Sequence, residues 1–95
     1  MQTKEISTKE PSAISQAHQV LERGGIIAFP TDTVYGVAAG IFSIEGIDAL
    51  YRAKERDPEK AIPVLMSSFA DLEQVAENVS QVACLLGQEF WPGPL

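Results

Sequence analysis

Apolar residues recur along the chain in two patterns, and these predict alternating helices and strands. Short, continuous, β-branched runs at 26–29 and 62–66 predict buried strands, and the glycine-interrupted run 34–42 predicts a further one. Apolar residues at helical spacing predict four helices, over residues 12–23, 44–56, 69–79 and 80–91. Helices that alternate with strands are typical of an α/β domain.

Local signals set the expected boundaries of these elements. Ser12 is a suitable N-cap for the first helix, and Gly24–Gly25 stop it. Asp57–Pro58 should end the second helix, because the residue before a proline is driven out of the α region. Residues 1–11 are polar, so we expect a flexible lead there and a folded domain over 12–95.

Composition limits the class of protein. A chain of 95 residues has room for one domain at most, and its 45% hydrophobic content indicates a globular chain. The single cysteine, Cys84, excludes an intrachain disulfide and a thiolate metal cluster, and its apolar neighbours predict a small core residue. No signal core precedes the domain, and no apolar run reaches the roughly 20 residues that span a bilayer, so we expect a cytoplasmic location without a membrane partner.

Charge is unevenly distributed. Thirteen acidic and seven basic residues give a net charge of −6, which disfavours nucleic-acid binding through bulk charge. Four of the seven cations nevertheless lie within nine residues, and no lysine or arginine follows them. They are Arg52, Lys54, Arg56 and Lys60. Such a cationic spot on an acidic chain indicates a small anionic ligand.

The segment 30–36, with the sequence PTDTVYG, is the first candidate site. It places two hydroxyls and a carboxylate after a predicted buried strand, and ligands of open α/β sheets bind at the carboxyl ends of strands. Gly36 would let the backbone approach a ligand closely. An ordinary turn accounts for the same residue types, so both interpretations stand.

The end of the second helix is the other candidate. Lys54 shares a helical stripe with Ile47, Leu50 and Tyr51, which predicts that it lies on the inward face. A lysine there either extends its stem outward or points into a cleft. Arg56, at the helix end, either stabilises the helix dipole or grips two oxygens of a phosphate.

Two further side chains favour structural roles. His18 has no apolar partner at helical spacing and is expected on the surface. Trp91, next to Phe90, is expected to anchor a core rather than to stack on a base.

Three segments together resemble the YrdC-like family of threonylcarbamoyl-AMP synthases: GGIIAFPTDTVYGVAAG at 24–40, IDALYRAKERDPEKAIPVLM at 47–66 and FWPGPL at 90–95. The resemblance covers residues 24–95. It implies one α/β domain with a twisted mixed sheet, flanking helices and a basic cleft, of which this chain holds the N-terminal, incomplete part. It implies synthesis of threonylcarbamoyl-AMP from L-threonine, bicarbonate and ATP, with release of pyrophosphate.

The resemblance also assigns residues and partners. Thr33 and Tyr35 would bind L-threonine, while Lys54, Arg56 and Lys60 would bind ATP, the first two as the catalytic cations. Mg²⁺ would arrive with the nucleotide, and no protein metal site is expected. The product would pass to a transferase complex that modifies a tRNA adenosine next to the anticodon. Double-stranded RNA binding is also described in this family.

This sequence departs from the family pattern in two places. The family's Lys-x-Arg is normally completed by a Ser-x-Asn further along, which these 95 residues lack, and Val64–Met66 supplies no histidine for threonine. The turn sequence 91–95 normally leads into another element, so we expect a cut-off chain that is inactive or nearly so. The alternatives are a non-catalytic RNA-binding module, a domain of a larger carbamoyl-transferring factor, and a pseudo-enzyme or regulatory relative.

Overall fold

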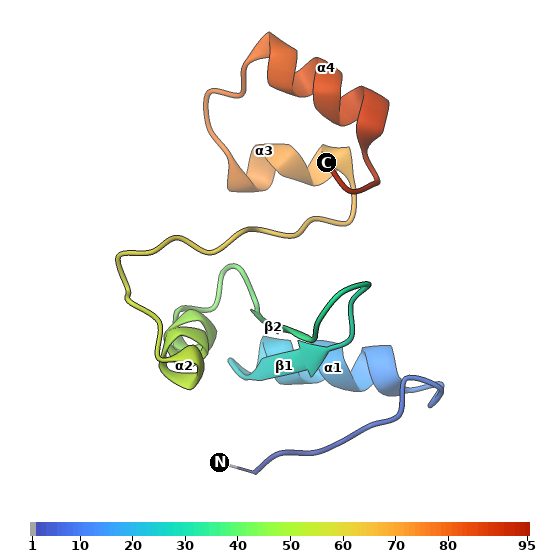
Figure 1. Cartoon of the computed structure of the whole chain (residues 1–95), viewed down its shortest axis with the longest axis vertical. Coiled ribbons are helices and arrows are strands. Elements are labelled where there is room, and N and C mark those ends of the chain that lie inside the picture. Colours follow the sequence, from blue (N-terminus) through green and yellow to red (C-terminus); the bar gives the residue numbers. More distant parts are fainter. Residues whose placement is uncertain (1) are drawn as a thin grey trace. The chain divides into compact units, whose positions relative to one another are not determined.

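The computed structural model describes residues 2–95 and separates into two compact units. Unit 1 runs over Met1–Ala61 and unit 2 over Ile62–Leu95 (Figure 1). Together they contain four α-helices and one small antiparallel sheet, which confirms an α/β fold class. No helix among the described residues is long and apolar enough to cross a membrane.

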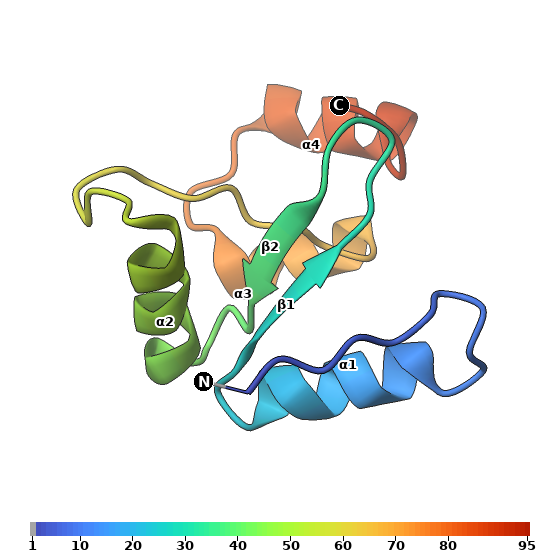
Figure 2. The ribbon, with the colours of Figure 1, turned by 60° about the horizontal axis from the view of Figure 1, so that its bottom comes forward.

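Unit 1 is a β-hairpin with a helix before it and a helix after it. The hairpin pairs β1 (Ile26–Phe29) with β2 (Gly36–Ala39) in antiparallel register. Helix α1 (Ala13–Glu22) precedes it, α2 (Ile44–Lys54) follows it, and both pack against its strands (Figure 2).

The structure confirms the strand 26–29 and shortens its neighbour. Only Gly36–Ala39 of the predicted run 34–42 is a strand, because β1 offers pairing partners to those residues alone. Helix α1 starts after Ser12, as predicted, but the Ser12 side chain caps no backbone N–H. Its hydroxyl instead accepts from Gln16 Nε2 at 2.8 Å.

Helix α2 ends at Lys54, two residues before the predicted end. Glu55 adopts a left-handed conformation with φ of 49°, which stops the helix before Asp57–Pro58 can act. The helix begins as the pattern predicts, since the Ser43 hydroxyl accepts the Gly46 N–H at 3.0 Å.

Unit 2 corrects two predictions. The predicted strand 62–66 is wrong, because the sheet of the described residues contains β1 and β2 alone and gives this run no partner. The predicted helix 69–79 is reduced to a 3-10 turn, Phe69–Asp71, and the short α3, Leu72–Val75. It stops because Ala76 is extended and Asn78 is left-handed, with φ of 52°.

Helix α4 (Gln81–Phe90) matches the predicted helix 80–91 closely, and the Ser80 hydroxyl caps it by accepting the Ala83 N–H at 3.1 Å. It contacts the rest of unit 2 through Gly87. A Cβ on that glycine would lie 2.8 Å from Cδ2 of Phe69, whose ring centroid is 6.3 Å from that of Trp91. Trp91 thus packs near Phe69, but it is half-buried and Phe90 is 55% exposed, so the described residues show no buried core around it as predicted. Cys84 is also only half-buried.

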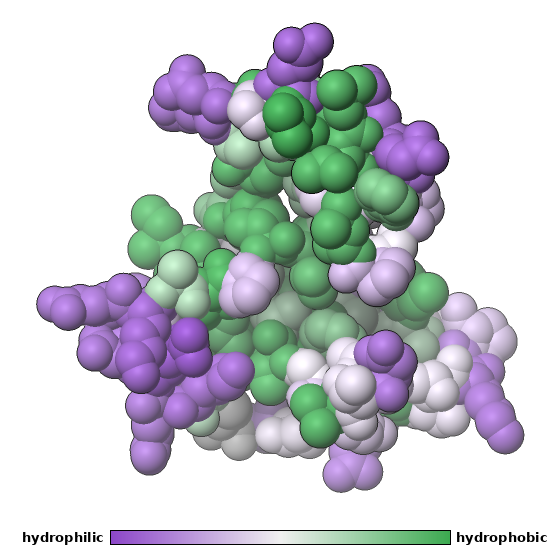
Figure 3. Space-filling model, turned by 45° about the horizontal axis from the view of Figure 1, so that its top comes forward, coloured by the Kyte–Doolittle hydropathy of each residue, from purple (hydrophilic) through white to green (hydrophobic). Residues whose placement is uncertain are grey.

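Little apolar surface is fully covered in the described residues. Leu50 on α2 is the one buried hydrophobic residue, at 4% exposure. Figure 3 shows hydrophobic residues across the face that it draws, and α4 leaves an apolar stripe open to solvent. Its members are Val82, Leu85, Leu86 and Phe90. Residues 2–11 contain no helix or strand, and whether they are flexible stays a prediction.

Candidate active site

The loop 30–35 joins the two strands of the hairpin, and residues 31–35 are all exposed. Thr31 organises it: the hydroxyl accepts the Thr33 N–H at 3.2 Å and donates to the Val34 carbonyl. The Thr33 hydroxyl lies 3.4 Å from the Thr31 hydroxyl, and it forms no other hydrogen bond among the described residues. Thr33 therefore sits, as expected, on an accessible loop at the carboxyl end of β1, and Tyr35, which was predicted to belong to the strand 34–42, lies on the same loop.

Gly36 has a packing role in this loop. A Cβ at this position would lie 3.0 Å from Cζ of Phe29, its cross-strand partner. The Phe29 ring thus covers the place where a side chain would stand. A larger residue here would therefore require the Phe29 ring to shift by a few tenths of an ångström, whether or not a ligand approaches.

The end of α2 has the hydrogen-bond pattern of a Schellman motif. The Arg56 N–H donates to the Tyr51 carbonyl at 3.0 Å, and the Glu55 N–H donates to the Arg52 carbonyl at 3.2 Å. The residue in the left-handed position is Glu55, where glycine or asparagine is usual. This motif turns the chain sharply away from the helix axis.

The segment 55–61 then folds back on the helix that it has left. Asp57 forms a turn: its carbonyl accepts the Lys60 N–H at 3.0 Å and its carboxylate accepts the Glu59 N–H at 2.9 Å. The Tyr51 hydroxyl donates to the Lys60 carbonyl at 2.5 Å, and Arg56 Nη2 donates to the Ala61 carbonyl at 3.1 Å. The segment is therefore an ordered loop.

The cations of this region differ in exposure. Lys54 and Lys60 are exposed, whereas Arg56 is half-buried and its Nε is buried without a hydrogen-bond partner. The prediction that Lys54 lies on the inward face is wrong. Ile47, Leu50 and Tyr51 of that stripe are buried or half-buried, but Lys54 is the last helical residue and the chain turns away there.

Acidic residues separate these cations in the sequence. Over residues 52–60, four cations and three carboxylates give a net charge of +1. None of these carboxylates lies within 4 Å of one of the cations among the described residues. The exposed Lys54 and Lys60 are thus not neutralised by these carboxylates, while Arg56 is partly engaged by the Ala61 carbonyl.

The two candidate groups lie on different parts of unit 1. Helix α2 contacts both strands of the hairpin, but in Figure 1 the 30–35 loop lies to the right of the strands and α2 to their left. A surface depression along α2 is lined by Ile47, Asp48, Tyr51, Arg52 and Pro58. Neither Thr33 nor Arg56 lines it, so the described residues do not unite the candidate groups in one pocket.

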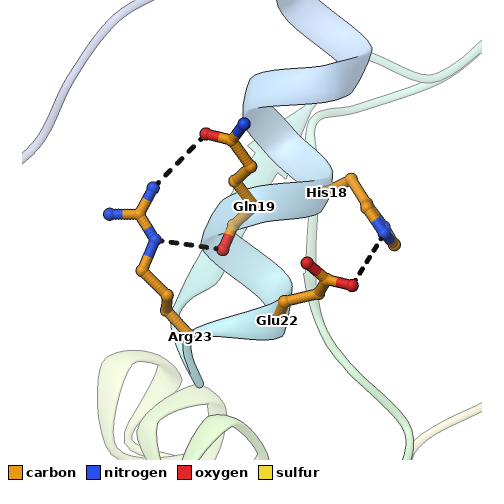
Figure 4. Close-up of polar contacts among 4 residues, drawn as sticks. All are labelled: His18, Gln19, Glu22 and Arg23. Atoms are coloured by element: carbon orange, nitrogen blue, oxygen red, sulfur yellow. Dashed lines mark hydrogen bonds and ion pairs between the residues drawn. The ribbon is translucent and has the colours of Figure 1, made fainter.

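His18 lies on the surface, as predicted. Its Nε2 is 3.0 Å from a Glu22 carboxylate oxygen one turn along α1, and the side chains are 67% and 65% exposed (Figure 4). The i, i+4 spacing in the sequence was the available signal for this pair. Nearby, Arg23 bonds only to Gln19, and nothing here suggests a site.

Sequence reasoning missed the anchoring roles of Tyr51 and Arg56. Tyr51 was assigned only to an apolar stripe, and the internal bond of Arg56 was not foreseen. Both bonds depend on the turn at 57–60, which places the Lys60 carbonyl near Tyr51 and the Ala61 carbonyl near Arg56. The spacing of residues in the sequence does not predict that the chain reverses here. The described residues hold no cluster of three or more His, Cys, Asp or Glu side chains that could bind a metal.

Comparison with known proteins identifies relatives of the chain. The Sua5/YciO/YrdC family model, described as "Telomere recombination", matches residues 19–95. The chain is 35% identical over 75 residues to the threonylcarbamoyl-AMP synthase of Pyrococcus abyssi, and 34% identical over 93 residues to that of Bacillus subtilis. It is 30% identical over 82 residues to the threonylcarbamoyl-AMP synthase of Coxiella burnetii. No solved structure gives a significant match.

These alignments cover most of this chain but less than half of each relative. They include 79%, 98% and 86% of the chain, against 22%, 27% and 44% of the Pyrococcus, Bacillus and Coxiella proteins. The chain therefore corresponds to a part of each relative.

Proposed function

Because the chain belongs to the Sua5/YciO/YrdC family, we propose that its protein is a threonylcarbamoyl-AMP synthase acting in tRNA modification. The observation that carries the proposal is the similarity over 93 residues to a protein of that name. Its substrates would be L-threonine, bicarbonate and ATP, and a cytoplasmic location belongs to the same proposal.

The exposed 30–35 loop supplies the proposed L-threonine contacts. The Thr33 hydroxyl has one neighbour, the Thr31 hydroxyl at 3.4 Å, and therefore retains capacity to bond a polar group of the amino acid. Tyr35 is 74% exposed and would line the same pocket. Thr31 holds the loop in shape through its bond to the Thr33 N–H.

The segment at the end of α2 supplies the proposed ATP contacts, with Lys54 and Arg56 as the catalytic cations and Lys60 beside them. A cation about 4 Å from a phosphate charge interacts by roughly 4 kcal/mol at an effective dielectric of about 20. Arg56 would bind phosphate oxygens through the guanidinium N–H groups that do not donate to the Ala61 carbonyl. Lys54 and Lys60, both exposed, would act as point charges.

The proposed reaction needs alignment and charge neutralisation more than a protein nucleophile. The threonine amine adds to bicarbonate, water is lost, and a carbamate forms. A carbamate oxygen then bonds to the α-phosphorus of ATP. The bond from that phosphorus to the bridging oxygen breaks, and its electron pair leaves with pyrophosphate. Cations near the α- and β-phosphates stabilise the charge that spreads in this step.

Mg²⁺ enters the proposal with the nucleotide. Magnesium in nucleotide sites is held largely by phosphates and water, with one or two carboxylates. Asp32, exposed on the 30–35 loop, is the carboxylate nearest in sequence to the proposed threonine contacts.

The 95 residues alone are proposed to be inactive or nearly so. Among residues 2–95 the sheet has two strands and Leu50 is the one buried hydrophobic residue, which is little support for a cleft that holds two substrates. The family's Ser-x-Asn is also absent from them. The complete site, and the hand-over of product to a transferase complex, are proposed for the full-length protein.

Exchange of labelled pyrophosphate into ATP tests the proposal. The full-length protein should catalyse exchange only when L-threonine and bicarbonate are both present, whereas the 95-residue chain should show none above background. Exchange without threonine would contradict the proposal, and robust exchange by the chain alone would contradict its inactivity. Salt-dependent binding to duplex RNA without ATP consumption would instead favour the RNA-binding alternative.

A further inference from the structure

Two consecutive carbonyl groups in the 55–61 segment accept side-chain hydrogen bonds. The Lys60 carbonyl accepts from the Tyr51 hydroxyl at 2.5 Å, and the Ala61 carbonyl accepts from Arg56 Nη2 at 3.1 Å. The Tyr51 bond attaches the Lys60–Ala61 peptide to α2, whereas the Arg56 bond closes the segment on itself, because Arg56 lies beyond the end of the helix at Lys54. An exposed loop without such anchors would sample many positions.

The turn between the helix and these anchors has its own hydrogen bonds. Asp57 accepts the N–H groups of Glu59 and Lys60, and Pro58 limits the backbone between them. The turn can therefore move as one body. The Tyr51 bond to the Lys60 carbonyl decides where that body lies relative to α2.

Tyr51 is well placed to act as an anchor. Its ring is half-buried on the inward stripe of α2, one residue from the buried Leu50. Its ring also lines the same depression as Pro58. A hydroxyl carried by a packed ring on a helix is a more rigid donor than one carried by a loop.

We infer that Tyr51 is a positioning residue for Lys60. Its hydroxyl holds the Lys60 carbonyl, and thereby directs the exposed Lys60 ammonium toward the phosphates of ATP. The inference rests on the proposed function, because it takes Lys60 as an ATP contact. It adds a role for Tyr51, which acts through Lys60 and does not itself touch the nucleotide.

The test removes one oxygen atom. Tyr51→Phe keeps the ring and loses the donor, so in the full-length protein it should raise KM for ATP about three- to tenfold, the range expected for one lost hydrogen bond. KM for L-threonine should change less than about twofold. A similar rise in both constants would indicate a general loss of structure and would overturn the inference.

A double-mutant cycle tests whether the effect passes through Lys60. In a Lys60→Met background, Tyr51→Phe should add less than about twofold to KM for ATP, because the ammonium that it directs is gone. Lys9→Met removes an exposed lysine outside the site and is the matched control, in which Tyr51→Phe should keep its full effect. Independent, multiplying effects in the Lys60→Met background would overturn the inference.

Limited trypsin digestion separates this inference from the proposed function, because the Tyr51 hydroxyl holds the carbonyl of the Lys60–Ala61 bond that trypsin would cut. Tyr51→Phe should speed cleavage after Lys60 at least about threefold, whether or not the protein has activity. Unchanged cleavage would overturn the anchor, even in an active enzyme. A wild-type protein without threonine-dependent ATP consumption, but with faster cleavage in the variant, would overturn the proposed function and leave the anchor standing.

Discussion

The hydroxyl of Thr31 accepts the backbone N–H of Thr33 at 3.2 Å, so the first threonine of the 30–35 loop orients the second. Thr33→Val removes the proposed substrate contact and should raise KM for L-threonine about tenfold in the full-length protein, with KM for ATP nearly unchanged. Steady-state pyrophosphate release measures both constants. An unaltered KM for threonine would contradict the role assigned to Thr33.

Thr31→Val should act on the same constant by a different route. It removes the bond that shapes the loop, while Thr33 keeps its hydroxyl, so KM for L-threonine should rise less than in Thr33→Val, by about threefold. Thr8→Val, at an exposed position outside the loop, is the matched control and should behave like the wild type. A larger effect of Thr31→Val would mean that this residue, and not Thr33, contacts the substrate.

Arg56→Ala should weaken ATP binding far more than threonine binding. The variant loses a charged donor to phosphate and the bond to the Ala61 carbonyl, so KM for ATP should rise about tenfold or more. Arg56→Lys restores the charge without the planar fork and should recover only part of the loss. Arg23→Ala is the matched control, because the Arg23 side chain bonds to no described residue other than Gln19. Equal losses for both substrates would refute the assignment.

Leu50→Ala should be strongly destabilising. Leu50 is 4% exposed, and truncation of a buried leucine costs about 2–5 kcal/mol of unfolding free energy. Urea unfolding followed by circular dichroism measures the change. Leu65→Ala, at a leucine 77% exposed, is the matched control and should change stability by less than about 0.5 kcal/mol. Similar losses in the two variants would show that Leu50 packs no better than a surface leucine.

Gly87→Ala adds one methyl group to α4 and should disturb its packing against Phe69 and Trp91 in unit 2. The new Cβ would stand 2.8 Å from the Phe69 ring and 3.2 Å from Trp91, so the aromatic pair must shift, at a cost of about 1–3 kcal/mol. Trp91 fluorescence should report the shift directly, since this is the only tryptophan in the chain. Gln88→Ala, exposed on the same helix, should leave both the emission and the stability within error. An unchanged spectrum in Gly87→Ala would contradict the packing described for α4.

The secondary-structure elements whose formation depends on residues close in the sequence could be predicted. The strand Ile26–Phe29 and the start of α2 at Ile44 follow from local apolar runs and from a serine before a helical pattern. The resemblance carried by 24–40 and 47–66 is also a property of the sequence, and the family match over 19–95 confirms it. The same motifs supplied the site residues, whose roles remain predictions.

Other features depend on groups that lie far apart in the chain. Residues 62–66 have the composition of a strand, yet a strand exists only where a neighbouring backbone supplies hydrogen bonds, and none does so here. The end of α2 was set by the left-handed Glu55 rather than by Pro58, which left Lys54 exposed.

The sequence by itself determined the family, the short local elements and the residue types at the candidate site, because each is encoded within a few neighbouring positions. The tertiary structure alone decided that Tyr51 and Arg56 hold the main chain at Lys60 and Ala61. The Tyr51 bond joins α2 to a segment that has turned back upon it, and the Arg56 bond closes that segment on itself. Their formation depends on the three-dimensional path of the chain, which hydrophobic periodicity does not describe.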